Sequence, residues 1–134
     1  MTFAENAFDI FSGTTALYHT TDCVDAPHAN PYSEGSIEAV LAAKNWIDAV
    51  QWHLEDIIRD PQIDPVAALA LKRRIDKSNQ DRTDMVEELD TYFRSKYADV
   101  KILENATINT ESPAWALDRL SILALKIYHM EQET

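Results

Sequence analysis

The sequence predicts an all-α protein built from a bundle of about four helices. Glycine occurs only twice, at Gly13 and Gly35, and residues 36–134 contain none. Glycine and proline interrupt helices. Their scarcity in this chain therefore favours long helices over turn-rich β-structure. At 134 residues the chain is long enough for one modest core, and we expect a single helical domain over 1–134.

The first helix is expected from Phe3 to about His19. Thr2 and Glu5 have capping-box spacing, in which each side chain satisfies a free backbone donor at the helix start. Residues 13–15, Gly-Thr-Thr, weaken the middle of this helix, so we expect a kink or a break there.

A loop over 20–34 leads to the second helix, from about Ser36 to Arg59, which stops at Pro61. An apolar seam with 3–4 spacing runs along this helix and predicts its buried face. Trp46 and His53 lie along one flank of the seam. The other flank is polar and consists of Lys44, Asp48, Gln51 and Glu55.

The third helix is expected from Pro65 to about Tyr97, with Asp64 as its N-cap. The short link before it predicts that helices two and three are antiparallel neighbours. Folding the chain about Ile63 places Asp48 opposite Ser78 and Asn79, Lys44 opposite Arg82, and Gln51 opposite Ile75.

Within this third helix, residues 76–84 contain no apolar side chain, and the apolar stripe passes through Asn79 and Arg82. A helix normally keeps its stripe apolar to pack against a core. The gap is therefore either exposed or lines a polar pocket, and the polar flank of helix two is predicted to meet it.

After a connector over 98–111, the fourth helix is expected from Pro113 to about Met130, with Ser112 as its N-cap. It is apolar almost all round, which predicts a central, buried helix. Arg119, Lys126 and His129 share one side of it, beneath Trp115.

Three long stretches, 44–61, 72–84 and 109–115, together with Asp118-Arg119-Leu120-Ser121, resemble a bacterial domain-of-unknown-function family, number 4254. The resemblance implies an α-helical bacterial protein and carries over no reaction and no catalytic residue. Members continue with further helical sequence, so we expect the chain to be a short member, a truncated one or a product of proteolysis. A site completed by that further part would be incomplete here.

Charge and composition narrow the function classes. The formal net charge of −11 argues against binding to nucleic acid or an anionic membrane. Cys23 is the only cysteine, so no intramolecular disulfide can form. The start of the chain lacks the pattern of a signal peptide, and no apolar run reaches the ~20 residues of a membrane helix. We therefore expect a cytoplasmic protein.

The first candidate site is a polar network between the helices. Three interpretations stay open: an ion-pair network that fixes helix register, a ligand-binding or catalytic pocket, or a solvent-exposed surface. The candidate residues are Asp48, Gln51, Glu55, Asn79, Arg82 and Arg119.

A metal site is a weaker candidate, and no cofactor is predicted. The Glu-x-x-His motif of di-iron bundles is absent. A divalent metal remains an alternative at His53-x-x-Asp56 or at the acidic residues of helix three. Carboxylates on helices are usually solvated, however. The acidic residues in question are Asp84, Glu87, Glu88 and Asp90.

Single side chains give two further candidates. His53 and His129 suit general acid–base catalysis because histidine titrates near neutrality, although a lone histidine at a seam edge is usually structural. Trp52 and Trp115 fall off their seams and either pack in the core or form an interface.

These observations favour a non-catalytic module that forms a homo-oligomer or docks a protein partner. The alternative is a small ligand-binding protein or enzyme. It would use Asp48, Glu55 and His53 as acid–base groups and anchor anions through Arg82 and Arg119. Metal-dependent hydrolysis of phosphate esters or nucleotides is one form of that alternative.

Overall fold

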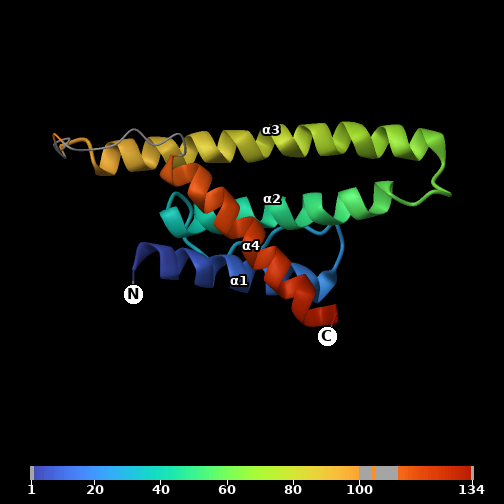
Figure 1. The fold of residues 1–134 in the computed structure, drawn as a ribbon, viewed down its shortest axis with the longest axis horizontal. Helices are drawn as coiled ribbons and strands as arrows, with labels where there is room; N and C mark the ends of the chain where they lie inside the picture. The colour runs from blue at the N-terminus through green and yellow to red at the C-terminus, as the bar shows by residue number, and fades with distance from the viewer. Residues whose placement is uncertain (1, 100–103, 105–111, 134) are drawn as a thin grey trace.

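The computed structural model describes residues 2–99, 104 and 112–133, and this part of the chain contains four helices and no strand (Figure 1). The prediction of an all-α bundle of about four helices is confirmed. The connector predicted over 98–111 lies largely outside the described residues. The helices are α1 (Phe3–Thr21), α2 (Ile37–Ile58), α3 (Pro65–Lys96) and α4 (Pro113–Glu133).

Local capping determines where the helices begin, because the first backbone N–H groups of a helix have no partner within it. The caps predicted at Thr2, Asp64 and Ser112 are confirmed, and Ser36 caps α2. Each of these side chains accepts a hydrogen bond from the backbone N–H three residues later: Glu5 to Thr2 at 3.1 Å, Ala39 to Ser36 at 3.1 Å, Ala67 to Asp64 at 3.1 Å and Trp115 to Ser112 at 3.3 Å.

The first helix, α1, is continuous through Gly13, so the predicted break is wrong. Thr14 and Thr15 are buried, and the hydroxyl of Thr15 donates to Oδ1 of Asn45 on α2 at 2.9 Å. Tertiary contacts therefore compensate for the low helix propensity of this segment. The helix ends at Asp22, which adopts the left-handed conformation.

The long helices α2 and α3 are antiparallel neighbours, as predicted (Figure 1). Their alignment is displaced from the predicted one by one helical turn, since Gln51 hydrogen-bonds to Asn79 rather than facing Ile75. The reason is an asymmetric link: α3 begins beyond the end of α2. Val66 and Leu69 in its first turns are consequently 77% and 52% exposed.

The last helix, α4, lies across the bundle and contacts α1, α2 and α3 (Figure 1). One face is buried through Ala114, Leu117 and Leu125. The expectation of burial on all sides is wrong, because the opposite face is exposed. Its exposed large apolar side chains are Trp115, Leu123, Ile127 and Met130.

The main apolar core lies where α1 and α4 meet α2 and the second half of α3. Phe11, Leu41 and Leu89 are among its most buried side chains. None of the described helices is both long enough and apolar enough to cross a membrane.

Candidate functional site

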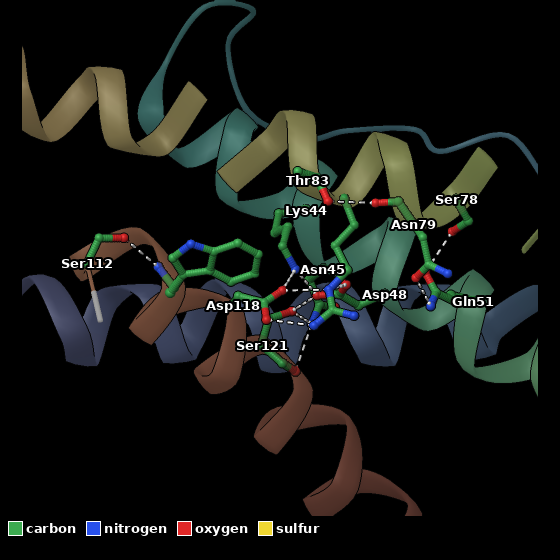
Figure 2. Close-up of polar contacts among 12 residues, drawn as sticks. Lys44, Asn45, Asp48, Gln51, Ser78, Asn79, Thr83, Ser112, Asp118 and Ser121 are labelled. Carbon is green, nitrogen blue, oxygen red and sulfur yellow. Dashed lines mark hydrogen bonds and ion pairs between the residues drawn. The ribbon is translucent and has the colours of Figure 1, made fainter. Parts of the chain in front are cut away.

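Four charged side chains meet between α2, α3 and α4, and three of them are almost fully buried. Lys44 is 0% exposed, and Asp48 and Asp118 are 5% and 2% exposed. The Lys44 ammonium contacts Asp48 and lies 2.7 Å from Oδ1 of Asp118 (Figure 2). Arg82 donates from Nε and Nη2 to the two oxygens of Asp118, at 2.7 Å each. We call these four residues the charge cluster.

Arg82 contacts both carboxylates of the cluster, Asp118 more closely than Asp48. Nε of Arg82 is 3.7 Å from Oδ1 of Asp48, whereas its bidentate partner is Asp118. The closest cation to Asp48 is Lys44, one turn earlier on the same helix. Two cations and two carboxylates balance, which is how buried charges are normally tolerated.

A chain of neutral polar groups extends the charge cluster to α1. The hydroxyl of Ser121 donates to Oδ2 of Asp48 at 2.7 Å. Nδ2 of Asn45 donates to Ser121 Oγ at 2.9 Å, and Thr15 donates to Oδ1 of Asn45 at 2.9 Å. Side chains from all four helices thus form one hydrogen-bonded network, which restricts how the helices can slide past one another.

Burial and ion pairing act oppositely on the two carboxyl groups. Burial raises the pKa of Asp48 above its ordinary value, although Lys44 and Ser121 act to lower it. For Asp118, burial also acts to raise the pKa, but the hydrogen bonds and charges of Arg82 and Lys44 outweigh it, so its pKa lies below the ordinary value. The hydrogen bond to Asp118 raises the pKa of Arg82, which stays protonated.

A small cleft of about 190 Å³ opens beside the charge cluster. Four predicted candidates meet there, since Asp48, Gln51, Glu55 and Arg82 all line it, with Trp52 as an apolar wall. Asn79 is adjacent: it accepts a hydrogen bond from Nε2 of Gln51 at 2.7 Å, and the hydroxyl of Ser78 donates to Oε1 of Gln51 at 3.1 Å (Figure 2).

Arg119, the remaining predicted anion anchor, lies elsewhere. It is exposed and lines a shallow groove of about 540 Å³ along the outer face of α4, together with Leu123 and Lys126. The structure therefore separates the predicted candidates into the cleft and this outer groove.

The histidines form a third location. His53 and His129 do not line the cleft; they meet His19, from α1, in a group whose nitrogen atoms lie within 4.8 Å of one another. Asp56, the alternative metal partner of His53, is exposed and lies 3.6 Å from Arg59. Among the described residues, this histidine trio is the group placed to hold a metal, and the acidic residues of α3 are not part of it.

The two tryptophan candidates have different environments. Trp52 is half-buried and stacks on His129, with ring centroids 4.7 Å apart and an interplanar angle of 5°. Trp115 is 41% exposed at the start of α4. Trp52 therefore packs inside the bundle, and Trp115 remains at the surface.

Sequence reasoning did not include Asp118, Ser121 and His19 among the site candidates. A signal for the first two existed, because they interrupt the apolar stripe of α4 just as Asn79 and Arg82 interrupt that of α3. His19 gave no signal, since its partners come from two other helices and no spacing connects them.

These features define an all-α bundle whose interior holds a balanced charge cluster and a small polar cleft. The sequence model of one family, described as Protein of unknown function (DUF4254), matches residues 38–134, more than half of the chain. The chain belongs to this family, as the sequence resemblance indicated. No curated protein and no solved structure matches it.

Proposed function

We propose that this domain is a non-catalytic helical module that associates with a second copy of itself through the outer face of α4. The observation that carries the proposal is the exposure of large apolar side chains on that face. Leu123 and Ile127 are 46% and 37% exposed, and Met130 is 67% exposed. Burying such side chains in an interface contributes favourably through the hydrophobic effect.

In an antiparallel arrangement, a second copy would bring opposite charges together along this face. In an antiparallel pairing of two α4 helices, the register that places Leu123 opposite Ile127 also places Arg119 opposite Glu131 of the second copy. This follows because both pairs of residue numbers have the same sum, 250. A two-fold symmetric dimer then contains each of these contacts twice.

The charge cluster supports the same function by keeping α4 in place. Asp118 and Ser121 project from the buried face of α4 into the network, while Leu123 and Ile127 project from the other face. An interface helix held in one register presents a preformed surface, which reduces the ordering cost of association.

Sedimentation velocity across a concentration series tests the proposal. We expect the wild type to be dimeric at micromolar concentration and Leu123→Glu to be monomeric. Leu69→Glu is the matched control, because Leu69 is similarly exposed at 52% but lies on α3. A wild type that stays monomeric, or a Leu69 variant that dissociates equally, would contradict the proposal.

A charge swap tests the register. Arg119→Glu alone is expected to weaken the dimer, and Arg119→Glu combined with Glu131→Arg is expected to restore it, because the double variant reverses both partners. If the double variant does not recover dimer formation, this antiparallel register is ruled out. The use of the α4 face itself would then still be decided by the Leu123 variant.

The cleft beside the charge cluster supports a second candidate function, binding of a small polar molecule. Its volume of about 190 Å³ is smaller than the ~300–1,000 Å³ typical of drug-sized ligands. Its lining combines two carboxylates with one guanidinium, from Asp48, Glu55 and Arg82, which favours a small amine. His53 and Arg119 lie outside the cleft, so the enzyme version of this function loses one proposed acid–base group and one proposed anion anchor.

Thermal-shift measurements with a panel of small amines test this candidate. A binding amine is expected to raise the melting temperature of the wild type but not of Glu55→Gln. Glu87→Gln, at an exposed position on α3, is the matched control and should respond like the wild type. A panel without any stabilising amine would remove the candidate.

A further inference from the structure

Three histidines converge from three different helices at the end of the bundle opposite the start of α1. His19 lies on α1, His53 on α2 and His129 on α4. Nε2 of His19 is 3.1 Å from Nε2 of His53, and the ring centroids of the three imidazoles are 5.0–5.3 Å apart. The rings meet at interplanar angles of 60–75°, which is a T-shaped, edge-to-face arrangement in each pair.

The backbone selects the tautomer of His19. Its Nδ1 lies 2.7 Å from the carbonyl oxygen of Thr15. A carbonyl oxygen can only accept, so Nδ1 carries the proton and Nε2 presents a lone pair towards His53. A hydrogen bond from the second ring nitrogen to a backbone carbonyl is the arrangement that normally orients a metal-binding histidine.

An aromatic side chain stacks on each of the three imidazoles. Tyr128 stacks on His19 with centroids 4.1 Å apart, Tyr18 stacks on His53 at 4.9 Å, and Trp52 stacks on His129 at 4.7 Å. These contacts restrict ring rotation and preorganise the nitrogen atoms.

We propose that His19, His53 and His129 bind a divalent transition metal ion of the zinc class, with an open fourth position beside Asp22. Imidazole nitrogens at Zn–N distances of ~2.0–2.1 Å in tetrahedral geometry lie about 3.3 Å apart. The nitrogens here lie within 4.8 Å of one another, a spread that small side-chain rotations close. The ion takes the place of the proton between His19 and His53, and His53 then carries its proton on Nδ1.

The fourth position is suited to water or a small anion. Asp22, the residue that ends α1, has Oδ1 4.0 Å from Nε2 of His53 and a side chain that is 64% exposed. Its carboxylate adds negative charge at the solvent side of the site, where a metal-bound water could donate to it. The set of three histidines with one open position excludes ions that prefer all-oxygen ligands, such as Ca²⁺ and Mg²⁺.

Calorimetry with Zn²⁺ on the tag-free chain tests the site directly. We expect one ion per chain, and His19→Gln, His53→Gln or His129→Gln should each weaken binding at least about 100-fold, since even losing an outer-shell partner costs 10–100-fold. His28→Gln is the matched control: it removes a histidine that stacks on Trp46 outside the cluster and should leave the affinity unchanged. Cys23→Ser controls for binding by the exposed thiol and should also leave it unchanged.

A second measurement uses the wild type alone, so it does not require any variant to fold. In the wild type, Zn²⁺ should shift the imidazole NMR resonances of His19, His53 and His129 and leave those of His28 in place. No stoichiometric Zn²⁺ binding by the wild type would overturn the proposal. So would loss of binding in Cys23→Ser, or an equal loss in His28→Gln, because either would place the ion elsewhere.

Discussion

At the residue scale, the least expected feature is a lysine with no exposed surface. Lys44 lies between two carboxylates, those of Asp48 and Asp118, and removing it would leave them with Arg82 as the one nearby cation among the described residues. Deleting one partner of a buried ion pair typically lowers the free energy of unfolding by several times the amount that an exposed ion pair contributes. The contribution of the charge cluster to stability is therefore best tested with single substitutions.

Lys44→Met is expected to lower the free energy of unfolding by about 3–5 kcal/mol. Methionine fills a similar volume but supplies no charge to the two carboxylates. Lys72→Met is the control, because Lys72 makes the same i, i+4 pair with Asp76 at a position where both side chains are more than half exposed. That control should cost under about 1 kcal/mol. Urea unfolding measures both, and equal costs would mean that solvent reaches the cluster.

The two aspartates should give stability profiles of opposite slope. The pKa of Asp118 is lowered below 3.8 in the folded state, so its contribution is present above that value and is lost as the pH falls through the lowered pKa. The pKa of Asp48 is raised above 3.8, so its contribution is present below 3.8 and is lost as the pH rises through the raised pKa.

We therefore expect the stability difference between the wild type and Asp118→Asn to shrink on acidification. Over the same pH range, the free energy of unfolding of the wild type should rise relative to that of Asp48→Asn. Urea unfolding of the three proteins from neutral pH to about pH 3 measures these trends. Slopes of the same sign for both variants would contradict the assigned pKa directions.

At the element scale, local sequence signals predicted the helices and where they begin. Tertiary contacts determined the continuity of α1 and the alignment of α2 with α3. Thr2, Asp64 and Ser112 were identifiable because a cap acts within three residues of itself. Local signals did not reveal the continuity of α1 through Gly13 or the one-turn displacement between α2 and α3. These two features depend on a hydrogen bond from Thr15 to Asn45 and on the direction in which the link leaves α2.

The cap at Asp64 gives a prediction at this scale. Asp64→Ala should lower the free energy of unfolding by about 1 kcal/mol, because the N–H of Ala67 loses its side-chain acceptor. Asp64→Asn keeps an acceptor and should cost only a few tenths of that amount. Thermal unfolding followed by circular dichroism distinguishes the two. Equal losses would mean that the negative charge near the helix dipole, rather than the hydrogen bond, is the stabilising feature.

At the scale of the whole molecule, the candidate site was predictable only in part. The polar flank of helix two and the polar gap of helix three directed attention to Asp48, Gln51, Glu55 and Arg82, and the structure places all four around one cleft. The polar residues of α4 also stood out in its apolar sequence, but Asp118 was not assigned to the network. The histidine trio depends on the relative placement of three helices, which no spacing within the sequence encodes.

Net charge decides how the proposed dimer should respond to salt. Each copy carries a formal charge of −11, so association brings two strongly acidic molecules together. The Arg119–Glu131 contacts across the dimer are exposed pairs, which contribute at most about 1 kcal/mol each. Repulsion between the whole molecules should outweigh them at low ionic strength, where the Debye length of ~30 Å at 0.01 M leaves it largely unscreened.

Raising the salt concentration from about 0.01 M to about 0.15 M, where the Debye length falls to ~8 Å, should therefore strengthen the dimer. Sedimentation equilibrium at the two ionic strengths measures the change in dissociation constant. Arg119→Glu removes the attractive contacts and makes each copy more acidic, so its dimer should depend on salt more steeply than that of the wild type. A wild-type dimer that weakens with salt would mean that local charge pairing, rather than burial of Leu123 and Ile127, provides most of the affinity.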